Sequence, residues 1–135
     1  MPTEANKAIV LRLVTEAQSA GNLDVVDELL AEDFIDYTPP PGIPPTRAGF
    51  KMLFGYLRAA FPDLRVTVHE QIAEGDRVMT RKTLQGTHRG EFMGRPGTGR
   101  LVSFEVIDII TLRNSKICEH RLLLDRLAIQ EQLAV

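Results

Sequence analysis

The residues best suited to chemistry lie in a predicted β-hairpin near the end of the chain. Segment 101–112 alternates as a strand does, and segment 117–125 follows it after a polar turn. Because side chains alternate across a strand, Asp108 is the one charge on a face that it shares with Val102, Phe104, Val106, Ile110 and Leu112. A carboxylate among apolar neighbours is costly unless it is paired or does chemistry. Asp108 is therefore a candidate for either role.

The hairpin turn predicts a partner for this carboxylate. With residues 114–115 at the centre of the turn, antiparallel pairing places Asp108 opposite Arg121 and Phe104 opposite Asp125. The Asp108–Arg121 pair is then either a structural ion pair or the polar floor of an apolar pocket, where Arg121 keeps Asp108 ionised and polarises a substrate carbonyl. A bulge would shift this register and reverse the faces.

Three more residues of this region have two possible roles each. Asp125 stands where it can cap a helix predicted for residues 126–133 or act in the pocket. His120 falls on the opposite face from Asp125 in this register, so a structural role competes with a catalytic one. His88 precedes a glycine-rich connection and is expected either at the pocket rim or in the structure around it.

The elements that position these residues are predicted to be three helices followed by a sheet. Apolar residues recur at helical spacing up to Gly21, again over residues 23–30, and again between the N-cap Thr46 and Pro62. From Leu64 the period changes to two, which predicts a mainly antiparallel sheet of about four strands, plus any short strand near Phe34. Helices and strands that are segregated along a chain indicate an α+β fold.

Composition excludes several classes of protein. The chain has 135 residues, which suits one domain, and its net charge of −2 offers no bulk attraction to nucleic acid or to an anionic membrane. No apolar run is long enough for a membrane span, and the first residues lack the features of a signal peptide. The lone Cys118 excludes an internal disulfide and fits a cytoplasmic location.

Motifs for other chemistries are missing from the sequence. It contains no glycine-rich phosphate loop, no Gly-x-Ser-x-Gly elbow and no His-Glu-x-x-His motif. Its three histidines, at positions 69, 88 and 120, are scattered, so no metal site is predicted.

Several short segments, in order along nearly the whole chain, carry a resemblance to a known family. They are Phe34–Tyr37 (FIDY), Ala60–Leu64 (AFPDL), Glu74–Val78 (EGDRV), Gly86–Phe92 (GTHRGEF) and Lys116–His120 (KICEH), with Asp125 beyond them. Together they resemble the SnoaL-like polyketide (ester) cyclases of the nuclear-transport-factor-2-like superfamily. The family usually has the motif Glu-His-Trp, whereas this chain has Glu119-His120-Arg121. Arg121 therefore replaces an aromatic wall of the expected pocket with a cation.

The resemblance implies a single SnoaL-like domain over residues 1–135. Its fold would be a cone, in which a curved, mainly antiparallel sheet and three N-terminal helices enclose a pocket. It implies an intramolecular aldol ring closure on a small hydrophobic molecule, without metal or organic cofactor, in which the conjugated substrate delocalises the enolate charge. The family's catalytic aspartate matches Asp125. A homodimer or homotetramer formed through the sheet is also implied.

The expected site combines these catalytic candidates with apolar walls. The catalytic candidates are Asp125, Asp108, Arg121 and His120, and the residues expected to bind substrate are Phe34, Tyr37, Phe54, His88, Phe92 and Phe104. Two alternatives remain open at this point. One is an epoxide-opening hydrolase, in which an Asp-Arg-Asp set activates water. The other is a non-catalytic module that binds a small ligand.

Overall fold

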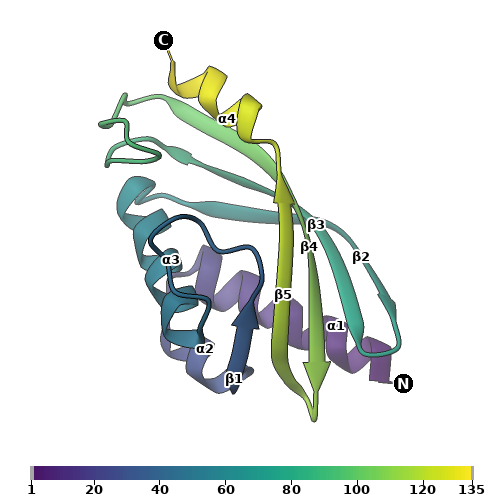
Figure 1. Ribbon diagram of the computed structural model, residues 1–135. Helices are drawn as coiled ribbons and strands as arrows, with labels where there is room; N and C mark the ends of the chain where they lie inside the picture. The colour runs from purple at the N-terminus through teal and green to yellow at the C-terminus, as the bar shows by residue number, and fades with distance from the viewer. Residues whose placement is uncertain (1, 135) are drawn as a thin grey trace.

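A computed structural model describes residues 2–134 and has one curved sheet covered on one side by helices (Figure 1). The helices are α1 (Pro2–Arg12), its π-helical continuation η1 (Leu13–Ser19), α2 (Asp24–Leu29), α3 (Arg47–Ala60) and α4 (Arg126–Leu133). The strands are β1 (Leu30–Asp36), β2 (Arg65–Glu74), β3 (Arg77–Thr87), β4 (Leu101–Arg113) and β5 (Lys116–Leu124). None of the helices between residues 2 and 134 is both long and apolar enough to cross a membrane.

The sheet has the strand order β1-β5-β4-β3-β2. All neighbours are antiparallel except β1 and β5, which run parallel. The α+β prediction is confirmed, and the short strand expected near Phe34 is β1 at the edge of the sheet. The third helix begins as predicted, because the Thr46 hydroxyl accepts a hydrogen bond of 3.1 Å from the Gly49 amide.

A bulge in the last hairpin overturns the predicted register. Near the turn the pairing is the expected one, since Arg113 lies opposite Lys116, but from Thr111 onward the register is shifted by one residue, because Cys118 is unpaired. Asp108 therefore lies opposite Leu122, and Arg121 lies opposite Ile109 on the other face. The predicted Asp108–Arg121 pair is wrong for this reason. The extra residue brings His120 to the face of Asp108 instead.

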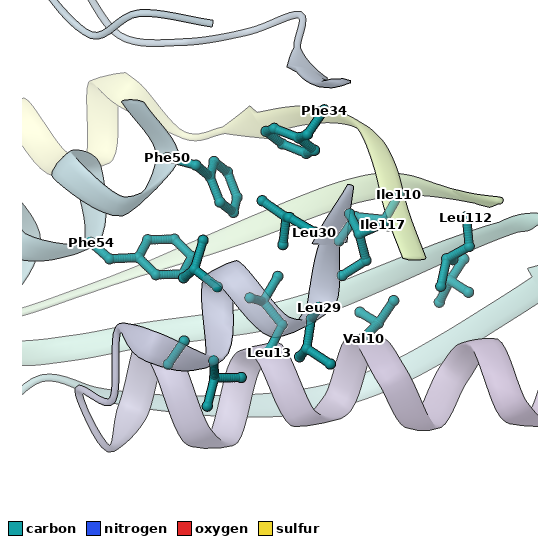
Figure 2. Packing of buried hydrophobic residues seen from close by; sticks show 14 residues of the cluster. Val10, Leu13, Leu29, Leu30, Phe34, Phe50, Phe54, Ile110, Leu112 and Ile117 are labelled. Atoms are coloured by element: carbon teal, nitrogen blue, oxygen red, sulfur yellow. The ribbon is translucent and has the colours of Figure 1, made fainter. Parts of the chain in front are cut away.

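The buried apolar residues form two clusters along the concave face of the sheet. One lies under the N-terminal helices, where Figure 2 shows Phe50 and Phe54 of α3 directed toward the same core as Leu13 and Leu30. The other lies near α4 and includes Phe61, Leu84, Phe92, Val102, Phe104 and Val106. Along β3 and β4 the inward positions between the two clusters are polar, and these positions hold the candidate site.

Candidate functional site

Five polar residues form a buried layer between the two apolar clusters. Thr80 and Lys82 come from β3, Asp108 from β4, His120 from β5 and Asp36 from β1. All five side chains are buried. Because each strand alternates, the apolar residues on either side of these positions face the same way and surround the layer with hydrocarbon. We call these five residues the polar layer.

Asp108 occupies the centre of the polar layer. Its Oδ2 lies 3.0 Å from Lys82 Nζ and 3.8 Å from His120 Nε2. Its Oδ1 is buried and has no hydrogen-bond partner within residues 2–134. Burial is the largest influence and disfavours the charged form, but Lys82 and His120 together outweigh it and lower the pKa of Asp108. The carboxylate is thus held ionised with one oxygen free.

His120 connects Asp108 to the edge of the sheet. Its Nδ1 donates a hydrogen bond of 3.0 Å to Asp36 Oδ1, and its ring packs edge-on against Phe50 at a centroid distance of 4.9 Å. The same Asp36 oxygen accepts a 3.0 Å bond from the Thr38 amide. Burial opposes the imidazolium most strongly, but the carboxylates of Asp108 and Asp36 outweigh it and raise the pKa of His120.

This raised pKa predicts how stability depends on pH. A group whose pKa is higher in the folded state contributes stability that is complete below its unfolded value, here 6.5, and is lost as the pH rises through the folded value. We expect the free energy of unfolding to fall above pH 6.5 by at most about 1.4 kcal/mol per pH unit. Urea unfolding at several pH values measures it, and His120→Gln should remove that slope. An equal slope in this variant would contradict the assignment.

A cavity of about 880 Å³ opens beside the polar layer. Its walls are mainly apolar and include Phe50, Leu53, Phe54, Leu57, Leu84, Phe92, Phe104, Val106, Leu122 and Ile129. Its polar lining includes Gln18, Lys82, Asp108 and His120. This volume lies within the range of about 300–1,000 Å³ that is usual for pockets binding small molecules. A few polar groups in an apolar pocket can orient a largely hydrophobic ligand.

The structure brings part of the predicted site together. Asp108 and His120 lie in the polar layer and line the cavity, as do Phe54, Phe92 and Phe104 from the predicted apolar wall. These residues come from α3, β4, β5 and the connection between β3 and β4. The hairpin thus places Asp108 and His120 beside the cavity, with histidine in the place predicted for arginine.

The other two catalytic candidates lie elsewhere. Asp125 is exposed and caps α4, since its Oδ1 accepts a 3.0 Å bond from the Ala128 amide. Arg121 is exposed and lies 4.1 Å from the ring centre of Tyr37, in a cation–π contact. Neither is among the residues that line the cavity. The Asp-Arg-Asp set required by the epoxide-opening alternative is therefore not assembled.

Three predicted substrate-binding residues also lie outside the cavity lining. Phe34 is buried in the apolar cluster under the helices. Tyr37 is 47% exposed, and its hydroxyl donates to Glu119. His88 is fully buried against Phe61, and its Nδ1 accepts a 3.3 Å bond from the Thr98 amide. The prediction that these three residues contact substrate is not supported by where they lie.

Sequence reasoning missed Thr80, Lys82 and Asp36 of the polar layer, and Gln18 beside Lys82. Lys82 could have been found, because it is the one charge among the inward positions of β3, just as Asp108 is on β4. Asp36 and Gln18 carry no such signal, since they precede a loop and end a helical segment. Within residues 2–134, no group of three histidine, cysteine, aspartate or glutamate residues is arranged to hold a metal ion.

Comparisons with known proteins show the family to which this chain belongs. A family profile described as SnoaL-like polyketide cyclase matches residues 8–133. The chain is 31% identical to the nogalonic acid methyl ester cyclase of Streptomyces nogalater over 110 residues. This alignment covers 80% of this chain and 82% of that protein. It is also 30% identical to the aklanonic acid methyl ester cyclase DauD of Streptomyces sp. (strain C5) over 129 residues. This alignment covers 92% of this chain and 79% of that protein.

Solved structures share the same fold. IdmH of Streptomyces antibioticus, a candidate polyketide cyclase, matches with a TM-score of 0.83 and 33% identity, over 96% of this chain and 99% of that one. AclR of Streptomyces galilaeus, a candidate hydroxylase, matches with a TM-score of 0.86 and 29% identity, over 98% of this chain and 97% of that one.

Proposed function

Because this chain belongs to the SnoaL-like polyketide cyclase family, we propose that it closes a ring in a small hydrophobic polycarbonyl compound by an intramolecular aldol reaction. One observation carries the proposal. Asp108 Oδ1 is buried, has no partner among the described residues and belongs to a side chain that lines the cavity. A free carboxylate oxygen in an apolar pocket is suited to take a proton from a carbon acid.

The reaction needs one base and returns its proton. Asp108 Oδ1 takes the proton from a carbon next to a carbonyl group, and the electron pair of the broken C–H bond forms an enolate. The enolate carbon then attacks a second carbonyl carbon in the same molecule, which forms the C–C bond and leaves an alkoxide. The proton on Asp108 passes to that alkoxide. No oxidant, reductant or second substrate is required.

The position of Asp108 supports it as the base over Asp125. Lys82 and His120 both face its Oδ2, which leaves Oδ1 available to a ligand. His120 acts as a positioning residue in this proposal, held by Asp36 at one nitrogen. The oxygen of Asp125 that accepts the Ala128 amide is committed to capping α4, at an exposed position.

The relatives suggest the substrates to test. They are named for the methyl esters of nogalonic acid and aklanonic acid, and the cavity of about 880 Å³ has mainly apolar walls. Each ester would be incubated with the protein and followed by chromatography, because ring closure by this route changes the retention time without changing the mass. If neither ester is converted and neither exchanges its acidic C–H protons for deuterium, the proposal is overturned.

We further propose that the partner of the outer sheet face is a second copy of this chain. The outward positions of β4 and β5 hold Ile107, Ile109 and Leu123, which are 39%, 38% and 78% exposed. Arg81 of β3 lies beside Ile107 and pairs with Glu105. An apolar strip on a sheet face, rimmed by charges, is typical of a protein–protein interface.

Substitution on this outer face tests the dimer. Ile107→Glu should raise the Kd of the dimer by at least about a hundredfold, because each copy loses buried apolar area and gains a like charge. Light scattering coupled to size-exclusion chromatography measures the mass in solution. Glu105→Gln, on the same face and strand, is the matched control and should remain dimeric. A wild-type protein of monomer mass at high concentration would contradict the proposal.

A further inference from the structure

Lys82 has an unusual environment for a lysine. Its side chain is 4% exposed, and in the sheet it lies between Val68 on β2 and Val106 on β4. Its ammonium group contacts Asp108 Oδ2 at 3.0 Å and donates to Gln18 Oε1 at 3.0 Å. An ammonium group has three N–H donors, and the described residues supply two partners. The third donor is left for something in the cavity that this side chain lines.

If Lys82 and Asp108 formed a purely structural ion pair, we would expect fewer of their hydrogen-bond donors and acceptors to lack a partner. Removing an ammonium from water is costly unless its hydrogens find acceptors, and a buried carboxylate has the same requirement. Here Lys82 keeps a free donor and Asp108 keeps a free acceptor at Oδ1. Both groups line one cavity, so a single ligand that presents an oxygen and an acidic C–H group can satisfy both.

The position of Gln18 is fixed by an irregular helix. It lies in the π-helical segment η1, and π-helical turns are frequent at functional sites. Arg58 holds this turn, because its Nη2 donates to the carbonyl oxygens of Gln18, at 3.0 Å, and of Ser19. The side chain of Gln18 can therefore hold Lys82 at the cavity wall, as a second partner beside Asp108.

We propose that Lys82, positioned by Gln18, binds the substrate oxygen on which negative charge develops. This inference rests on the proposed function and adds an oxyanion site and a substrate class to it. When Asp108 Oδ1 takes the proton, the electron pair of the C–H bond moves to the neighbouring carbonyl oxygen, beside the ammonium. A preorganised cation at that point stabilises the enolate more than the neutral ketone.

The consequence concerns the substrate. The resemblance implies a substrate that delocalises the enolate charge over conjugated rings, and a bound ammonium group at Lys82 would remove that requirement. The protein can therefore act on a 1,3-dicarbonyl compound that is not part of a polyaromatic system. The carbonyl oxygen would lie at Lys82 and the acidic carbon at Asp108, with the remainder of the molecule against Leu84, Phe92 and Phe104.

The first test measures the binding of an oxyanion without turnover. In Asp108→Asn the carboxylate is gone, so 4-nitrophenolate should bind beside Lys82, and its absorbance reports how much is ionised. Adding Lys82→Met should weaken this binding by about a hundredfold, the effect typical of removing one oxyanion donor. Lys82→Arg should restore part of it. Arg81→Met, on the outer face of the same strand, is the control for loss of a cation. Equal binding with and without Lys82 would overturn the proposal.

The second test separates this inference from the proposed function. Exchange of the central C–H protons of benzoylacetone for deuterium reports proton abstraction alone. We expect exchange in the wild type, none above buffer in Asp108→Asn, and a rate about a hundredfold lower in Lys82→Met. Loss in Asp108→Asn with a normal rate in Lys82→Met would overturn the oxyanion site and leave the base in place. A wild-type rate equal to buffer would contradict the proposed function, and nitrophenolate binding would still decide the role of Lys82.

A third measurement distinguishes an ammonium from an amine nucleophile. If Lys82 attacked a carbonyl to form a Schiff base, sodium borohydride would reduce the imine and add the mass of the reduced probe to the protein. We expect the mass of wild-type protein to be unchanged after treatment with benzoylacetone and borohydride. A stable adduct that is absent from Lys82→Met would overturn the oxyanion role.

Discussion

Asp108→Asn should lower the rate of proton abstraction and of ring closure by about a thousandfold, within the range usual for loss of a general base. The amide keeps the shape of the carboxylate and still accepts a hydrogen bond from Lys82, so the fold should be retained. It cannot take a proton from carbon at neutral pH. Deuterium exchange into benzoylacetone, and conversion of the two methyl esters, measure the loss directly.

Two matched variants test whether the loss is specific to the carboxylate of Asp108. Glu105→Gln makes the same change on the outer face of the same strand and should leave the rate within about twofold, because surface substitutions of this kind have small effects. Asp125→Asn makes it at the cap of α4, where asparagine caps about as well as aspartate. If Asp125 were the base instead, Asp125→Asn would show the thousandfold loss and Asp108→Asn would not.

Asp108→Leu should destabilise the protein by about 3–5 kcal/mol, because it leaves the buried ammonium of Lys82 with Gln18 as its one remaining partner among the described residues. Replacing both partners, as in Lys82→Met with Asp108→Leu, should restore most of that loss, since two apolar side chains suit the surrounding hydrocarbon. Urea unfolding gives the free energies, and the double variant should remain inactive.

Comparing Asp108→Leu with the double variant shows whether the Lys82–Asp108 pair serves the stability of the fold or the chemistry of the site. If the double variant is as unstable as Asp108→Leu alone, the ion pair itself holds the fold together. A stable but inactive double variant would mean that the pair is retained for what it does to a ligand. The matched control is Arg81→Met with Glu105→Leu, an exposed pair on the outer face, which should change stability by less than about 1 kcal/mol.

Most of the fold could be predicted from local patterns. The helical spacing before Gly21, the Thr46 cap and the change of period at Leu64 each depend on residues close together in the chain. The bulge could not be predicted in the same way. Ile117 and Cys118 are consecutive and both buried, so the alternation of the strand breaks there, and the spacing of apolar residues does not say which of the two is the extra one. Tertiary packing decides which of the two is extra.

Site residues could be predicted from the sequence only where one charged residue interrupts the apolar face of a single strand. Asp108 was recognisable as one charge in an apolar alternation, and Lys82 has the same signature on β3. Asp36 and Gln18 reach the polar layer through the packing of β1 on β5 and through the turn of η1. Neither relation is encoded in the spacing of nearby residues. Because the predicted register lacked the bulge, the prediction placed Arg121 on the face of Asp108, where the structure has His120.

The bulge at Cys118 also bears on how such a pocket can change during evolution. If this strand paired without the bulge, Cys118 would lie opposite Thr111, His120 would turn outward, and Arg121 would lie opposite Asp108, so that the carboxylate would face a permanent cation in place of a titratable ring. The presence or absence of this one bulge therefore decides which of two acid–base chemistries the strand presents to the pocket, and a change that removed it would be a short route from one to the other.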